Sequence, residues 1–277
     1  MPAAHLLLFG VGYVGAAVAR AAEAAGFTVA GITRAAFGSA GGEVGRATHL
    51  LSTVPPDGAG DPVLVRYADA IAAAPALRWI GYLSTTGVYG DRGGGWVDED
   101  TEPAPGSERS RRRLAAEAGW RRFADRRAVD LFRLAGIYGP GRSAFDDLRA
   151  GTARRVVRPG HTFGRIHRDD IVRAVMAAMR QPRDGGVRVL HLADDAPAES
   201  AEVMAEAARL LGIAAPVPVP FEQACVTMSP MARSFWAEDR KVSSRRTQQE
   251  LGLRWRYPSY REGLCAILAE ERGESPA

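Results

Sequence analysis

The chain has 277 residues, of which 46% are hydrophobic and 25% charged, and its net charge is +4. This is enough apolar material for a sizeable core, and the two cysteines, Cys225 and Cys265, match no metal-ligand spacing. The positive charge comes from arginines scattered along the chain, so we expect no nucleic-acid partner. No stretch reaches the ~20 uninterrupted apolar residues of a membrane span, so we expect no membrane partner and a cytoplasmic location.

The first 33 residues read as a strand, a glycine turn, a helix and a second strand. Residues 5–9 form the first apolar strand, and residues 27–33 form the second. In the turn between the first strand and the helix, the first glycine permits a sharp bend, the second lets a pyrophosphate approach the backbone, and the third allows close helix packing. The free N–H groups at the helix N-terminus would bind the phosphates. The cofactor-binding positions predicted here are Gly10, Gly12, Tyr13, Val14 and Gly15.

The residues that follow the second strand bear on the choice of cofactor. NAD-binding folds place an acidic residue there, whereas this chain has Thr33 and Arg34. A guanidinium suits the additional 2′-phosphate of NADP. We therefore expect NADP as the cofactor, with NAD as the alternative, and a merely solvated arginine as the competing interpretation of Arg34.

Strand and helix patterns alternate along the rest of the chain. Strands are expected at 49–54, 79–84, 129–134 and 187–192, and helices at 63–74, 114–128, 169–179, 200–211 and 260–270. This alternation predicts an α/β protein with a Rossmann-type doubly wound parallel sheet. Only residues 35–47 separate Arg34 from the next strand. This connection is too short to contain a helix, a strand and a second helix. We therefore expect the usual third strand to be absent or shortened.

Five motifs occur in a family-specific order. They are Gly10-x-Gly12-x-x-Gly15, the Leu-Ser-Thr-Thr-Gly-Val-Tyr-Gly-Asp of 83–91, the Phe-Arg-Leu-Ala-Gly-Ile-Tyr-Gly-Pro-Gly of 132–141, the Arg-Ile-His-Arg-Asp-Asp of 165–170, and the segments 250–253 and 257–264. Together they resemble the atypical extended short-chain dehydrogenase/reductases, the NAD(P)-dependent epimerase/dehydratase-like proteins. The resemblance implies an NADP-binding core of 1–140 and 168–195. It also implies a smaller, mostly helical substrate-side part of 141–167 and 196–277.

The family's chemistry uses a Ser or Thr hydroxyl, a Tyr-x-x-x-Lys pair and an Asn. The resemblance places the hydroxyl at Thr85 and the Asn counterpart at Asp61, which could equally be only a helix N-cap. Arg109 stands at the Tyr position and Arg113 at the Lys position. Tyr89 and Tyr138 are the alternative proton donors, and both could instead be packing residues. We keep Thr85, Asp61, Arg109, Arg113 and Tyr138 as the catalytic candidates.

The two arginines change the expected chemistry. A guanidinium stays protonated at working pH, so neither side chain can shuttle a proton. Arg113 could still hold a ribose hydroxyl, as the family lysine does. Arg109 and Arg113 are four residues apart and share a helix face, which suits a carboxylate or phosphate on the substrate. The competing interpretation is a pair of solvated arginines on a rotated helix.

The resemblance also implies the remaining site positions. Further cofactor-binding residues are Ser52, Thr53, Val54, Ser84 and Arg113, and the substrate-binding residues are Thr86, Gly136, Arg165 and His167. A hydrogen-bonded structural histidine is the alternative for His167. The segment 228–236, rich in Met, Phe and Trp, could line a substrate cleft, although we expect mostly buried packing.

Two functions are compatible with these residues. The first is an NADP-dependent oxidoreductase or epimerase/dehydratase-like enzyme. It would transfer hydride at a hydroxyl or carbonyl carbon of a small, anionic or sugar-like substrate, either as a monomer or as a homodimer. The second is a non-catalytic NADP(H)-binding redox sensor or regulatory protein, which the missing Tyr and Lys favour. The retained hydroxyl at Thr85 and the substrate-side part favour the enzyme, which we prefer.

Overall fold

A single parallel sheet organises the larger lobe of the protein. The computed structural model describes residues 4–181 and 183–274. The sheet has the order β10-β6-β4-β3-β1-β2. Its strands are β1 (His5–Phe9), β2 (Thr28–Ile32), β3 (His49–Ser52), β4 (Trp79–Thr85), β6 (Ala128–Leu134) and β10 (Val187–Leu192). All neighbouring pairs are parallel, so the predicted Rossmann-type α/β fold is confirmed.

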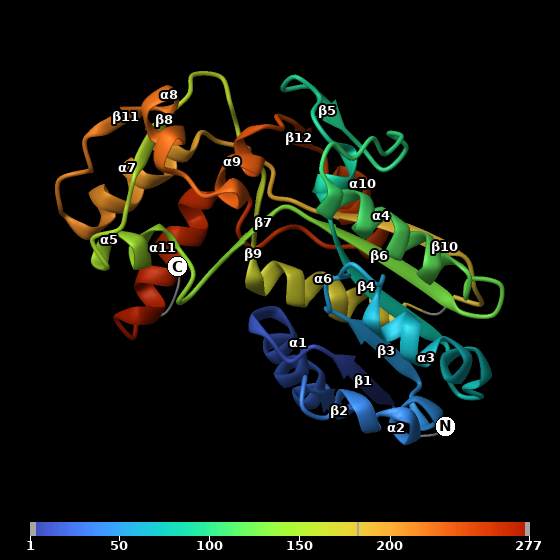
Figure 1. Ribbon diagram of the computed structural model, residues 1–277. Helices are drawn as coiled ribbons and strands as arrows, with labels where there is room; N and C mark the ends of the chain where they lie inside the picture. The colour runs from blue at the N-terminus through green and yellow to red at the C-terminus, as the bar shows by residue number, and fades with distance from the viewer. Residues whose placement is uncertain (1–3, 182, 275–277) are drawn as a thin grey trace.

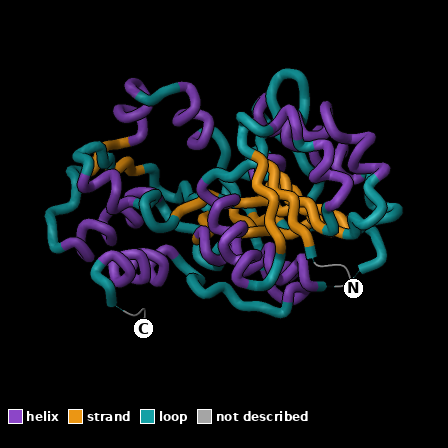
Figure 2. The backbone as a smooth tube through the Cα atoms, turned by 90° about the horizontal axis from the view of Figure 1, so that it is seen from below, coloured by secondary structure: helices purple, strands orange, loops and turns teal. Residues whose placement is uncertain are grey.

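Helices cover both faces of the sheet because side chains on each strand alternate between two apolar clusters. Leu6 and Leu8 belong to the cluster under one helical layer, and Leu7 and Phe9 to the cluster under the other. The first layer contains α1 (Tyr13–Ala24), α6 (Arg168–Arg180) and α10 (Arg245–Leu251), and the second contains α2 (Gly41–Arg46), α3 (Pro62–Ala73) and α4 (Glu108–Arg121). Figure 2 shows the strands of the sheet enclosed by these helices.

The third strand of the usual Rossmann order is missing, as predicted. In the described segment 33–48, the chain forms a 3₁₀ turn (Phe37–Ser39) and the six-residue α2, and no strand. It then returns across β1 to form β3, so that β1 pairs with both β2 and β3. The sheet therefore grows from β1 in two directions, with β2 on one side and β3 and the later strands on the other. Doubly wound sheets bind ligands at such a switch in strand order.

One predicted helix was misplaced. The expected helix over 114–128 is α4, which begins at Glu108 because Ser107 accepts a hydrogen bond from the backbone N–H of Ser110. It ends at Arg121, and Ala128 is already the first residue of β6. The arginine-rich first turn hid this start, because it carries no apolar periodicity.

The smaller lobe is mostly helical (Figures 1 and 2). It contains α5 (Ala144–Arg149), α7 (Ser200–Leu211), α8 (Phe221–Ala224), α9 (Pro230–Trp236) and α11 (Tyr260–Glu271), with the pair β8 (Arg155–Val157) and β11 (Pro218–Pro220). Two further pairs lie where the lobes meet: β7 (Gly136–Tyr138) with β9 (Arg165–His167), and β5 (Trp96–Val97) with β12 (Lys241–Val242). Within the described residues, no helix has the length and apolarity to cross a bilayer.

Candidate functional site

The glycine turn after β1 forms an open cradle. Gly10 has φ +92°, and a Cβ there would collide with the Thr53 hydroxyl. A Cβ at Gly15 would collide with the Gly10 carbonyl, so the helix can approach the strand only without a side chain. A Cβ at Gly12 would meet nothing within 4 Å. The space above Gly12 is therefore open.

The N-terminus of α1 borders this open space. Gly12 is its N-cap residue, and no side chain caps the helix among the residues described. The first N–H groups of α1 thus remain available to an anion. Uncapped N–H groups beside open space fit a cofactor diphosphate. The Val14 side chain is buried in the core, so this residue can face the open space through its backbone alone.

The other predicted cofactor residues surround the cradle in different ways. Thr53 donates a 2.8 Å hydrogen bond to the Gly10 carbonyl, which ties the end of β3 to the turn. The Ser52 hydroxyl is buried and has no hydrogen-bond partner in the described part of the chain, and Val54 packs at the edge of a core cluster. Arg34 is exposed just beyond β2. It has no carboxylate partner among the described residues, so its guanidinium is available to a ligand.

Tyr13 connects the cradle to the second lobe. Its hydroxyl donates a 3.0 Å hydrogen bond to the Pro140 carbonyl. The guanidinium carbons of Arg142 and Arg168 lie 5.8 and 5.3 Å from the centre of its ring. Two cations therefore flank Tyr13, one from the segment after β7 and one from the start of α6. Sequence reasoning missed both, because their proximity to Tyr13 comes from the tertiary fold alone.

The hydroxyl residues at the end of β4 point in different directions. The Thr85 hydroxyl is half-buried at the carboxyl edge of the sheet and accepts a 3.1 Å hydrogen bond from the Gly87 N–H. Ser84 lies on the opposite face of the strand and donates a 2.5 Å hydrogen bond to Glu117. Thr86 is buried, with its hydroxyl 3.4 Å from the Leu134 carbonyl. Of the three hydroxyls, only that of Thr85 belongs to a residue that retains substantial exposure.

The two candidate arginines of α4, Arg109 and Arg113, lie on one helix face but in different surroundings. Arg113 donates 2.9 Å hydrogen bonds from Nη1 to the Tyr82 hydroxyl and to the Leu83 carbonyl, which holds its guanidinium at the edge of β4, near Thr85. Arg109 is exposed one turn earlier, with its guanidinium carbon 5.8 Å from the centre of the Phe235 ring in α9. Arg113 is thus held by the sheet, whereas Arg109 reaches toward the second lobe.

Asp61 is the N-cap of α3. Its Oδ1 accepts hydrogen bonds from the Val63 and Leu64 N–H groups, at 2.9 and 3.1 Å, and its Oδ2 accepts one from the Trp120 indole at 2.9 Å. The carboxylate is buried, and burial is the main reason why its pKa is raised. Since both oxygens are engaged, the visible role of Asp61 is to fix α3 against α4.

Three of the four predicted substrate residues, Gly136, Arg165 and His167, lie together on the β7–β9 pair, whereas Thr86 lies apart, directly after β4. Gly136 is the register partner of Arg165, and Tyr138 is the register partner of His167. Tyr138 and Arg165 line a cavity of about 430 Å³ between α5, α7 and α11. The Tyr138 hydroxyl donates a 3.3 Å hydrogen bond to the Ser259 carbonyl, and burial raises its pKa, so this phenol holds its proton tightly.

His167 is a buried, hydrogen-bonded residue. Its Nδ1 accepts a hydrogen bond from the Asp169 N–H at 3.2 Å, and its ring stands edge-on to Tyr138 at 5.1 Å. Burial lowers its pKa to about 4, so it is neutral at physiological pH. These contacts fix the ring at the start of α6, while its buried Nε2 has no hydrogen-bond partner among the described residues.

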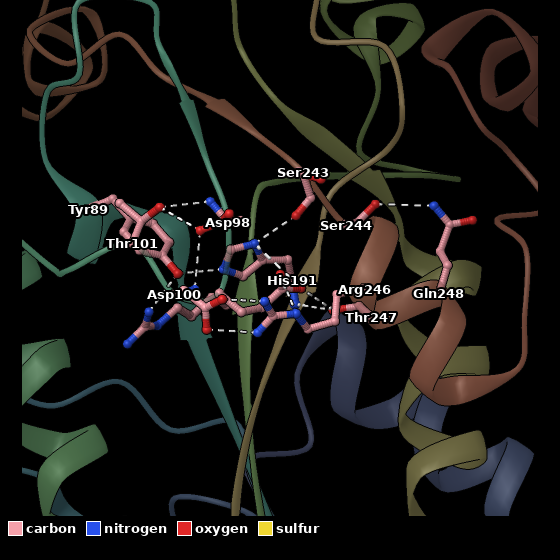
Figure 3. A network of polar contacts seen from close by, with 12 residues as sticks. Tyr89, Asp98, Asp100, Thr101, His191, Ser243, Ser244, Arg246, Thr247 and Gln248 are labelled. Carbon is pink, nitrogen blue, oxygen red and sulfur yellow. Dashed lines mark hydrogen bonds and ion pairs between the residues drawn. The ribbon is translucent and has the colours of Figure 1, made fainter.

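A buried network of hydrogen bonds supports the end of β4, and it was not predicted from the sequence. Arg133 forms an ion pair with Glu117 at 2.6 Å and donates a 2.7 Å hydrogen bond to the Tyr89 hydroxyl. His191 donates from Nδ1 to the Ser243 carbonyl, because a carbonyl can only accept, so its Nε2 accepts from Tyr89 at 2.5 Å. Figure 3 shows His191 between Tyr89 and Ser243.

This network of hydrogen bonds connects β4, α4, β6, β10 and the segment before α10. It begins at Ser84, next to Thr85, and ends at the Ser243 carbonyl. Its signal in the sequence was weak, because charged residues such as Glu117 and Arg133 are normally exposed unless they are paired. The network therefore fixes the end of β4, which carries Thr85.

Comparison with known proteins begins with a structure that matches nearly the whole chain. A functionally unknown conserved protein from Silicibacter pomeroyi DSS is 41% identical, with a TM-score of 0.88, and the match covers 96% of this chain and 99% of that one. The chain belongs to the family of this protein. No family model matches the sequence.

More distant members of the same fold have cofactors in their structures. Human epimerase family protein SDR39U1, solved with NADPH, has a TM-score of 0.76 at 18% identity, over 95% of this chain and 98% of that one. MoeE5, solved with UDP-glucuronic acid and NAD, has a TM-score of 0.74 at 20% identity, over 97% and 99%. These two structures confirm the fold that the motifs predicted, and each of them was solved with a nicotinamide dinucleotide.

Curated relatives match only part of the chain. Protein YeeZ of Escherichia coli K12 is 29% identical over 177 residues, which are 61% of this chain and 61% of YeeZ. A 3-diazoavenalumate denitrifying reductase of Streptomyces sp is 31% identical over 142 residues, or 48% of this chain and 45% of the reductase. The matched part is therefore less than two thirds of these relatives' length.

Proposed function

We propose that this family member is an NADP-dependent oxidoreductase or epimerase/dehydratase-like enzyme acting on a hydroxyl or carbonyl carbon. The observation that carries the proposal is the cradle: the N-terminus of α1 is uncapped among the described residues and faces open space above Gly12. This arrangement favours a dinucleotide diphosphate over a capped structural turn.

Each nearby residue has a role suited to its position. The exposed Arg34 would bind the 2′-phosphate of NADP, and the N–H groups of Arg113 not bound to Tyr82 or Leu83 would hold a ribose hydroxyl. Thr85 would orient the substrate oxygen at the sheet edge. Bound nicotinamide supplies the hydride chemistry, and the chain supplies binding and orientation.

The cofactor choice is testable through Arg34. Replacing Arg34 with alanine is expected to weaken NADPH binding by about tenfold or more, because a charge-assisted contact to the 2′-phosphate is lost. NADH affinity should stay unchanged. Isothermal titration calorimetry with both nucleotides measures this. Arg46→Ala is the control, since Arg46 is exposed and, within the described residues, pairs with Glu43 alone. Equal NADPH and NADH affinity in the wild type would contradict the NADP assignment.

A non-catalytic NADP(H) sensor is the second candidate, and Arg113 favours it. The guanidinium at the position of the family lysine is fixed by Tyr82 and Leu83, and it cannot move a proton. Turnover separates the two functions. Hydride transfer assayed with keto acids, sugar acids and nucleotide sugars should be lost in Thr85→Ala if the chain is an enzyme. Firm NADPH binding without turnover of any of these compounds would support the sensor.

A further inference from the structure

Arg109 differs from Arg111 and Arg112 on the same helix in having no acidic partner among the described residues. Arg111 and Arg112 pair with Glu108 at 3.2 and 3.0 Å, whereas Arg109 pairs with no carboxylate in residues 4–181 and 183–274. Its guanidinium lies against Phe235 instead, at 5.8 Å from the ring centre. The exposed cation is therefore left to a ligand and sits beside an aromatic ring.

Helix α9 presents an apolar face next to this cation. Trp236 anchors the helix on its inner side, where its ring stacks on His161 at 5.4 Å and packs edge-on to Phe163 at 4.9 Å. On the outer side, Met231 and Phe235 are four residues apart and are 63% and 55% exposed. The expectation of mostly buried packing in 228–236 therefore holds for Trp236 and fails for these two.

The position of α9 is fixed by the chain that follows it. The Asp239 N–H donates to the Asp91 carboxylate at 2.8 Å, and the Asp239 carbonyl accepts from the Arg92 N–H at 2.9 Å. Arg240 donates to the Gly90 carbonyl at 2.8 Å. These bonds tie the end of α9 to the loop after β4, and α9 consequently lies between the two lobes (Figure 1).

The same surface lies next to the proposed reaction site. Arg109 is one helical turn from Arg113, about 5–6 Å along the helix. Arg113 in turn reaches the Leu83 carbonyl, two residues before Thr85 on β4. A substrate whose oxygen contacts Thr85 would therefore extend past Arg113 toward Arg109 and α9.

We propose, building on the function proposed above, that Arg109, Met231 and Phe235 bind the substrate, and that the substrate is a carboxylate with an aromatic or other apolar body. An unpaired guanidinium binds a carboxylate through paired hydrogen bonds. Exposed methionine and phenylalanine side chains are stabilised when an apolar group covers them and removes their surface from water. They offer the hydroxyl groups of a sugar no hydrogen-bond partners. The surface thus favours an apolar acid over a nucleotide sugar.

The test compares two carboxylates of equal charge on the full chain saturated with NADP. Calorimetry with 3-phenylpropionate and with glucuronate should show at least about tenfold tighter binding of 3-phenylpropionate, because only its body can use the apolar face. 3-Phenylpropanol, which lacks the carboxylate, should bind weakly. Equal or tighter binding of glucuronate would overturn the proposal.

Single-residue variants test whether Arg109 and Phe235 contact the bound 3-phenylpropionate. Arg109→Gln should weaken 3-phenylpropionate binding by about tenfold, and Phe235→Ala by about fivefold. The controls are Arg112→Gln, whose arginine pairs with Glu108, and Val217→Ala, an exposed apolar residue outside α9. Unchanged affinity in both site variants overturns the proposal, as does a concentration-dependent dimer that Phe235→Ala abolishes while no 3-phenylpropionate binds. NADPH titration provides an independent control. If the wild-type protein does not bind NADPH, the proposed function is overturned, whatever the outcome with 3-phenylpropionate.

Discussion

Replacing Glu117 with glutamine is expected to lower the free energy of unfolding by about 3–5 kcal/mol, because it leaves a buried cation without its counter-ion. Glu117 and Arg133 have side-chain exposures of 0% and 3%, and three guanidinium-to-carboxylate hydrogen bonds join them. Arg133 would keep its hydrogen bond to the Tyr89 hydroxyl, but no carboxylate of the described residues would then neutralise its charge. Urea unfolding followed by far-ultraviolet circular dichroism measures the change.

Two comparisons separate burial from simple charge loss. Glu108→Gln removes an exposed carboxylate that also pairs with arginines, and it should cost no more than about 1 kcal/mol. The double variant Glu117→Met/Arg133→Met removes both charges, so it should be less destabilised than Glu117→Gln alone. A loss below about 1 kcal/mol in Glu117→Gln would show that the pair is not what holds α4 to β6.

The pattern of apolar residues along the sequence predicted the strands and helices whose own residues carry such a pattern. The strand at 187–192 and the helix at 200–211 were predicted at their observed limits, because a short run rich in apolar residues and a helical repeat each leave a clear pattern. The missing third strand followed from the length of one connection. By contrast, α4 was shifted because its start is marked by Ser107 and a run of arginines rather than by apolar residues.

The candidate site was predictable only where backbone geometry sets it. The glycine spacing identified the cradle, since each glycine answers a steric need that the sequence states directly. The surroundings of Arg109, Arg113 and Tyr138 were not predictable, because they depend on which distant segment faces each side chain: Phe235, Tyr82 and Ser259, respectively. Residues joined across more than 30 positions of sequence leave no local pattern to read.

Replacing Gly12 with alanine is expected to weaken NADPH binding by about 5- to 150-fold while the fold stays intact. Gly12 has φ −90° and ψ −159°, a conformation open to any residue, and its new Cβ would meet no atom of the chain within 4 Å. The methyl group would instead occupy the space where the diphosphate binds. Overpacking of that kind costs about 1–3 kcal/mol, and each 1.4 kcal/mol is about tenfold in Kd.

Two other glycines make the test specific. Gly45→Ala changes a glycine in α2 that also has open space around it, so it should leave NADPH affinity unchanged and raise the free energy of unfolding by about 0.5–1 kcal/mol. Gly15→Ala places its Cβ against the Gly10 carbonyl, so it should destabilise the protein even without cofactor. Calorimetry with NADPH, together with thermal unfolding, distinguishes the three variants. If Gly12→Ala binds NADPH as tightly as the wild type, the diphosphate does not lie over the first turn of α1, and the cradle has another purpose.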